Sequence, residues 1–104
     1  MEKMKFYTKN SVTDENVSFQ LDYSLVIRSA EQGNIYGVAV KKTDSLGIQE
    51  EEIVEGLCEN KDEAVQFLFG LAEGLALPIE LTALCDDFIS EREYGKQMVG
   101  QTAC

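Results

Sequence analysis

The sequence predicts an α+β domain, in which a three- or four-stranded antiparallel β-meander is followed by a two-helix hairpin packed on one sheet face. Apolar and polar residues alternate from Val17 to Arg28 with the single exception of Val26, which is typical of a long strand with one buried face. After residue 60 the apolar spacing changes to the three- and four-residue steps of amphipathic helices. Strands followed by helices favour an antiparallel sheet with helices on one side.

Two flanking stretches repeat the alternation and supply the neighbours of the long strand. Residues 4–12 precede a polar turn at 13–16, and residues 35–42 follow either a two-residue turn at Gln32-Gly33 or a four-residue loop. The opposed pairs predicted for the buried face are Met4 with Leu25, Phe6 with Tyr23, Val12 with Val17, Ile27 with Val38, and Leu25 with Val40. Residues 51–58 carry apolar residues among dense glutamates, and whether they form a fourth strand is left open.

The helical part begins with a capping pattern. Asn60 followed by Glu63 has the form of a capping box, so a helix is expected to start at Lys61. Its apolar arc covers about 200°, which predicts contact with both the sheet and another helix. Gly74 and the break before Pro78 end it, and a second helix is expected over about residues 78–92.

Length and charge limit the classes of protein. The 104 residues predict a single domain over residues 1–94 with a flexible C-terminal tail at 95–104. The formal net charge of -10 argues against binding nucleic acid or an anionic membrane, because both depend on Lys and Arg. The first residues lack the pattern of a secretory signal, and no apolar run approaches the roughly 20 residues of a membrane span. A cytoplasmic protein is predicted.

Residue types suited to catalysis or metal binding are scarce. The chain has no histidine, the commonest general base and metal ligand. Cys58, Cys85 and Cys104 are odd in number and lack paired ligand spacing. No carboxylate is singled out by an apolar pocket that would raise its pKa for acid-base chemistry. The sequence predicts no catalytic residue, no metal and no cofactor, and it favours a role other than that of an enzyme.

The polar face of the sheet carries a small apolar group near one hairpin tip. Its members are Val26, Ala30, Ile35 and Ala39. Such a patch on a polar face can mark a partner surface. Scattered exposed apolar residues are normal, however, and this simpler interpretation stands beside the functional one.

A second candidate surface is an acidic stripe on the second helix. Glu80, Asp87 and Glu91 lie within about 40° of one another at helical spacing. They predict a cation site or a docking stripe for a basic partner, or simply a solvated helix face. The strand edges differ in charge too, with Lys5 and Lys9 on one outer strand and Glu50 to Glu55 on or beside the other. These charges either block strand pairing or attract a second molecule.

Several short motifs carry a family resemblance. The strand Tyr36-Gly37-Val38, the helix start Glu63-Ala64, and the pattern Pro78, Leu81 and Asp87-Phe88 resemble small clostridial Firmicutes proteins grouped as a domain family of unknown function. The resemblance spans about residues 20–90. It implies a bacterial protein with no assigned reaction or cofactor.

Three functional hypotheses follow. The first is a non-catalytic protein-interaction or regulatory module that binds a protein partner or self-associates through the open sheet face or the acidic stripe. The second is a small-molecule-binding domain or enzyme with a site between sheet and helices, where Tyr7, Tyr23 and Tyr36 supply polar groups. The third is an acidic mimic of nucleic acid that occupies the groove of a basic partner, which the net charge of -10 suggests.

Overall fold

A computed structural model describes residues 2–12 and 17–91 of the chain and confirms the predicted α+β meander. Four strands come first: β1 (Glu2–Val12), β2 (Ser18–Ala30), β3 (Gly33–Asp44) and β4 (Gln49–Cys58). Helix α1 (Lys61–Glu73), the short 3-10 helix η1 (Pro78–Glu80) and a helix over residues 81–91 follow. Residues 51–58 therefore belong to a fourth strand. The predicted turn at 13–16 and tail at 95–104 lie outside the described residues.

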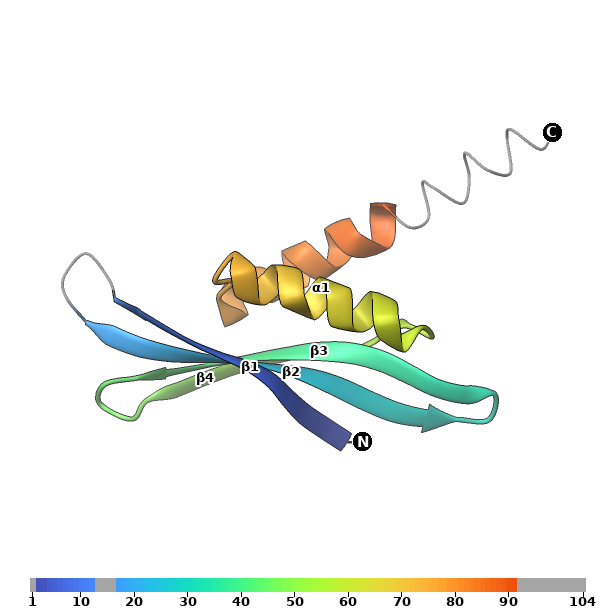
Figure 1. The fold of residues 1–104 in the computed structure, drawn as a ribbon, viewed down its shortest axis with the longest axis horizontal. Helices are drawn as coiled ribbons and strands as arrows, with labels where there is room; N and C mark the ends of the chain where they lie inside the picture. The colour runs from blue at the N-terminus through green and yellow to red at the C-terminus, as the bar shows by residue number, and fades with distance from the viewer. Residues whose placement is uncertain (1, 13–16, 92–104) are drawn as a thin grey trace.

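All four strands lie in one antiparallel sheet of order β1-β2-β3-β4 (Figure 1). Both helices cover the same face of this sheet (Figure 1). The C-terminal end of β1, the N-terminal end of β2 and the β3–β4 turn project beyond the helices, at the left of the view. We call this projecting part the wing, and we call the sheet face without helices the open face.

The β2–β3 hairpin differs from the predicted register by two residues. Its turn is Glu31-Gln32, one residue earlier than expected, so Ala30 lies opposite Gly33. Leu25 consequently lies opposite Val38, and the predicted pairs Ile27 with Val38 and Leu25 with Val40 are wrong. A shift of two residues leaves every side chain on its predicted face, so the buried face of the hairpin is as expected.

A bulge changes the register of the β1–β2 hairpin. Met4 lies opposite Leu25 as predicted, but the register shifts between Lys5 and Tyr7. The extra residue places Tyr7 rather than Phe6 opposite Tyr23. Val12 lies opposite Ser18 instead of Val17. The sequence alternation does not reveal this bulge, because both Phe6 and Tyr7 are aromatic.

The core lies between the sheet and the helices. From the sheet it takes Leu21, Tyr23, Leu25, Val38, Val40, Leu57 and Cys58, and from the helical part it takes Ala64, Leu68, Leu71, Ala72, Ala76, Leu81 and Cys85. The Tyr23 hydroxyl donates a buried hydrogen bond of 2.9 Å to the carbonyl oxygen of Ala76. This bond ties the central strand to the segment that joins the two helices.

Helix α1 begins and ends as its sequence predicts. The Asn60 side chain accepts a hydrogen bond of 3.1 Å from the backbone N–H of Glu63, which caps the first turn. Gly74 is the C-terminal cap, and Leu75 follows with a φ of +53°. Phe67 stacks on Phe88 of the second helix with ring centroids 4.5 Å apart. The helix thus contacts both the sheet and its neighbour, which confirms the interpretation of its wide apolar arc.

Candidate functional site

The open face is defined by the strand register, because residues opposite one another in neighbouring strands share a face. Alternation of side chains then assigns the remaining residues of each bulge-free stretch to one face or the other. The polar and charged residues of the open face are Lys3, Lys5, Thr8, Asn10, Ser18, Gln20, Asp22, Ser24, Arg28, Lys41, Thr43, Gln49 and Glu51. All four strands contribute to it.

The centre of the open face is buried although no helix covers it. Val26 and Ala39 are each only 1% exposed, and Ser24 is 5% exposed. These residues are short and lie on the two inner strands, where Gly37 adds no side chain. Strand β4 also approaches β2, although β3 separates them in the sheet, so the sheet is strongly curled here. Curling lets the longer side chains of the outer strands lean over the centre.

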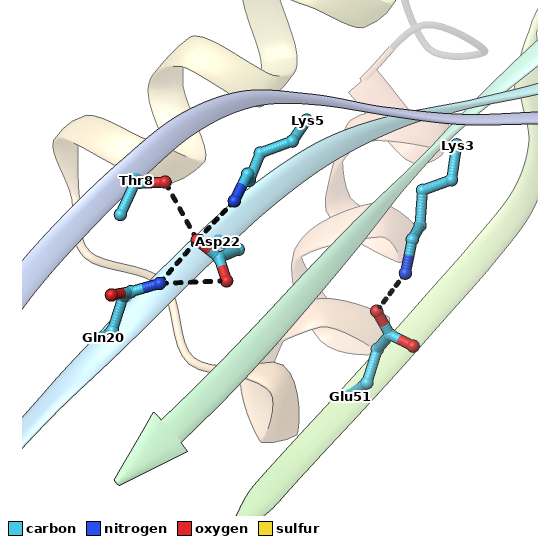
Figure 2. A network of polar contacts seen from close by, with 6 residues as sticks. All are labelled: Lys3, Lys5, Thr8, Gln20, Asp22 and Glu51. Carbon is cyan, nitrogen blue, oxygen red and sulfur yellow. Dashed lines mark hydrogen bonds and ion pairs between the residues drawn. The ribbon is translucent and has the colours of Figure 1, made fainter. Parts of the chain in front are cut away.

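An ion pair joins the two outer strands across this centre. The Lys3 ammonium on β1 lies 2.7 Å from a carboxylate oxygen of Glu51 on β4 (Figure 2). Lys3 stands directly opposite Val26 in the register. Both partners remain partly exposed, so the pair itself contributes at most about 1 kcal/mol to stability. Its structural effect is to place charged groups above the apolar centre.

Asp22 anchors a second polar network on the same face. It is 8% exposed and accepts hydrogen bonds from the Thr8 hydroxyl (2.9 Å) and the Gln20 amide (3.1 and 3.3 Å), as Figure 2 shows. The Lys5 ammonium lies 3.7 Å from the same carboxylate. Three strand residues thus hold one carboxylate in a fixed position. The open face is a pre-organised polar surface and not a set of independent solvated side chains.

The charge of the open face differs from that of the rest of the molecule. Lys41 on β3 lies directly opposite both Asp22 and Glu51, which makes an alternating row of charges across three strands. Among the described residues that the register assigns to this face, four are basic, namely Lys3, Lys5, Arg28 and Lys41, against the two carboxylates of this row. Basic groups therefore outnumber acidic ones among these assigned residues, in a chain whose formal net charge is -10.

The predicted apolar patch divides into two parts. Val26 and Ala39 lie in the buried centre, as described above. Ala30 is exposed and Ile35 is half-buried, and both line a cavity of about 520 Å³ at the β2–β3 hairpin. Tyr36 and Glu59 also line this cavity. The structure brings each pair together but does not join the four residues into one exposed surface.

The predicted acidic stripe lies on exposed positions. Asp87 and Glu91 are exposed on the helix of residues 81–91, and Glu80 is exposed at the end of η1. Glu80 also lines a cavity of about 350 Å³ with Phe67 of α1. Glu80 lies near the Tyr23 hydroxyl. Burial raises the pKa of this phenol to about 12, and the negative charge of Glu80 makes a smaller contribution in the same direction.

Three side chains that catalysis could use, Tyr7, Tyr23 and Cys85, take part in packing. The Tyr23 hydroxyl donates its hydrogen bond to the carbonyl oxygen of Ala76. The Tyr7 ring packs edge-on against the Phe69 ring, with the ring centroids 5.9 Å apart. Burial, and to a lesser extent Asp86, raise the pKa of the buried Cys85 thiol to about 12, which opposes thiolate formation. Within residues 2–12 and 17–91, no group of three or more His, Cys, Asp or Glu side chains is placed to hold a metal ion.

Comparison with known proteins places the chain in a family. Residues 2–91 match the model of a family of unknown function, DUF6514. The chain belongs to this family. The match spans the sheet and both helices, a longer stretch than the residues 20–90 of the resemblance. Neither the curated proteins nor the solved structures gave a match to this DUF6514 chain. No helix among its described residues is long and apolar enough to cross a membrane.

Proposed function

We propose that this chain is a non-catalytic protein-interaction module that docks an acidic surface of a partner protein on its open face. The excess of basic groups on that face carries the proposal. Charge complementarity of this kind orients partners and excludes competitors. The Asp22 network supports it too, because polar groups held in place before binding lose little conformational freedom on docking.

A protein partner fits this face better than a nucleic acid. Lys3 and Lys5 are already near carboxylates of the same face, which leaves few basic groups to neutralise phosphates. The overall charge of -10 would also repel a long polyanion at low salt. A protein surface offers isolated carboxylates that a few lysines can match.

The test compares two charge reversals in affinity capture from the native cell. Lys5→Glu combined with Lys41→Glu changes the open face, and both side chains are at least partly accessible. Glu80→Lys with Asp87→Lys and Glu91→Lys changes the acidic stripe and serves as the comparison. We expect the first variant to lose a partner that the wild type and the second variant retain. Circular dichroism checks that both variants fold.

The opposite result would move the function to the acidic stripe. If only the stripe variant loses the partner, and that partner is basic, the hypothesis of a docking stripe or a nucleic-acid mimic is favoured instead. Retention of the same proteins by all three forms would refute docking on either surface.

A small-molecule site is a second candidate, and the cavity at the β2–β3 hairpin is the observation that favours it. Its volume of about 520 Å³ lies in the usual range of ligand pockets. Its lining combines the Tyr36 ring with polar groups of the turn and Glu59. A ligand bound there should raise the melting temperature of the wild type but not that of Tyr36→Ala. A screen of metabolites by thermal shift tests this candidate.

A bacterial, clostridial origin and a cytoplasmic location complete the proposal. The motif resemblance supports the origin. Cys58 and Cys85 are buried as thiols and not as disulfides, which suits a reducing compartment. Fractionation of the native cell, followed by detection with an antibody to the chain, tests the location.

A further inference from the structure

The two edges of the sheet carry opposite charges, and these edges form a candidate interaction surface that is separate from the open face. Strands β1 and β4 are the outer strands of the sheet. An outer strand presents a row of backbone N–H and C=O groups that can pair with another strand. β1 carries Lys3, Lys5 and Lys9 with a single glutamate, Glu2. β4 carries the glutamates Glu50, Glu51, Glu52 and Glu55 and no basic residue.

Like edges repel one another. Two copies of β4 placed side by side would bring several glutamates together, and two copies of β1 would do the same with lysines. Like charges directly opposite in a sheet are destabilising. Pairing between like edges, which would give a closed two-fold dimer, is thereby disfavoured. Pairing between β4 and the β1 of a second copy brings opposite charges together.

Direction and space both allow this unlike pairing. In a four-stranded antiparallel meander β1 and β4 run in opposite directions, so a second copy placed beside β4 with its sheet in the same orientation continues the antiparallel order. The parts of β1 and β4 nearest the wing extend beyond the helical layer (Figure 1). A second sheet can approach there without displacing α1.

The bulges limit the regular stretches, and one register pairs these stretches along their full length. β1 is free of bulges over residues 7–12, and β4 is regular over residues 49–54. Aligning these two stretches antiparallel places Lys9 of one copy opposite Glu52 of the other and Tyr7 opposite Val54. Each of these pairs consists of residues that lie on the helix-bearing face in their own molecule. Shifting the alignment by one residue would place side chains on the wrong faces.

Lys9 and Glu52, the oppositely charged pair of this register, are both available. Neither Lys9 nor Glu52 has an ion-pair partner within the part of the chain that the structure describes. Glu52 is exposed and Lys9 is half-buried. Lys3 and Glu51 already meet across one molecule, so the two edges carry charges that attract at hydrogen-bonding distance.

We propose that β4 pairs antiparallel with β1 of a second copy of this chain, residues 49–54 against residues 7–12, with Glu52 opposite Lys9. This goes beyond docking on the open face, since it uses the backbone edges and names its partner. Because the two surfaces in contact are different, the assembly extends from head to tail and forms chains or rings. Its strength falls as ionic strength rises.

Sedimentation velocity over a range of protein and salt concentrations tests the proposal with four forms. The wild type should form species larger than a monomer as concentration rises. Lys9→Glu and Glu52→Lys should each weaken association roughly tenfold, because each replaces an opposite pair by a like pair. An equimolar mixture of the two variants should associate again, since the new carboxylate at position 9 of one variant then meets the new ammonium at position 52 of the other. The double variant should do the same.

Matched controls change the same charges away from the edges. Lys61→Glu and Glu73→Lys alter exposed residues at the two ends of α1 and should leave association unchanged. A wild type that stays monomeric at millimolar concentration would overturn the proposal, as would association that survives both single variants or is not restored in the mixture. None of these results bears on docking at the open face, because Lys9 and Glu52 lie on the other face.

Discussion

Replacing Gly37 by alanine should destabilise the fold more than any other glycine substitution in β3, because this position has no room for one methyl group. Gly37 lies opposite Val26 on β2, at the point where the β3–β4 register shifts. A Cβ atom there would lie 2.9 Å from the Cα of Glu55 and 3.0 Å from the carbonyl carbon of Val54, and it would clash still more closely with the Val54 carbonyl oxygen. All three are backbone atoms of β4.

The magnitude follows from what must move. A flexible side chain could rotate away, but here the backbone of β4 has to shift. Overpacking of this kind costs about 1–3 kcal/mol, and loss of one ladder hydrogen bond adds about 1 kcal/mol. We therefore expect Gly37→Ala to lower the free energy of unfolding by about 2–4 kcal/mol. With a urea m-value of about 2 kcal/mol/M, the midpoint should fall by about 1–2 M.

Gly70→Ala is the matched control and should act in the opposite direction. Gly70 is exposed within α1, and a Cβ atom there meets nothing within 4 Å. Alanine is favoured over glycine in a helix by about 0.5–1 kcal/mol, so this variant should raise the urea midpoint. If Gly37→Ala unfolds within about 0.5 kcal/mol of the wild type, the close approach of β4 to β3 described here is wrong.

Three other changes test the remaining structure. Tyr23→Phe removes the buried bond to Ala76 and should cost about 1–2 kcal/mol in urea unfolding, and an unchanged midpoint would contradict that bond. Asn60→Ala removes the cap of α1 and should lower the free energy of unfolding by about 1 kcal/mol. Asn60→Asp keeps a capping oxygen and should retain most of that stability, and thermal unfolding of both variants measures the difference. Folding raises the pKa of Tyr23 from 10 to about 12 and that of Cys85 from 9 to about 12. Since the unfolded chain releases these protons first, the stabilisation is complete below about pH 9 and is lost as the pH rises toward 12. Urea midpoints measured from pH 7 to 11 should therefore fall, and a flat profile in the wild type, or an equal slope in Tyr23→Phe with Cys85→Ala, would contradict this assignment.

The faces of the strands were predictable because burial sets a strict two-residue period. Leu21, Tyr23 and Leu25 lie in the core, as the alternation predicts. The start of α1 was equally predictable, since Asn60 caps it through a local contact. Both features depend on residues close together in the sequence.

The strand registers were less predictable, because alternative positions of a turn or a bulge bury the same set of apolar side chains. The β2–β3 turn moved by one residue, and both alternatives bury the same side chains. The bulge after Lys5 requires one extra residue to be accommodated in β1, and two adjacent aromatic residues satisfy the hydrophobic pattern equally well. Pattern alone carries no information that separates these cases.

The candidate site was only partly predictable, for a different reason. The sequence predicts that the polar residues of β2 form an open face, which the structure confirms. It does not predict the pair between Lys3 and Glu51, which lie 48 residues apart on strands that are not neighbours. One available signal was Asp22, a charged residue in the middle of the inner strand β2. A carboxylate at such a position needs partners, and Thr8 and Gln20 supply them.

The burial of Val26 changes where docking on the open face is expected. A sheet face that is covered by a helix needs bulky apolar residues at its centre, as the Leu21 and Tyr23 face has. The opposite face has Gly37, Ala39 and Ser24 there, and these small residues leave room for the outer side chains to cover the centre. The substitution Val26→Asp would place a carboxylate in this buried centre and would consequently test folding and not recognition. The partner proposed for this face would meet the charged side chains above the centre, so substitutions at Lys5 and Lys41 are the ones that test the proposed docking.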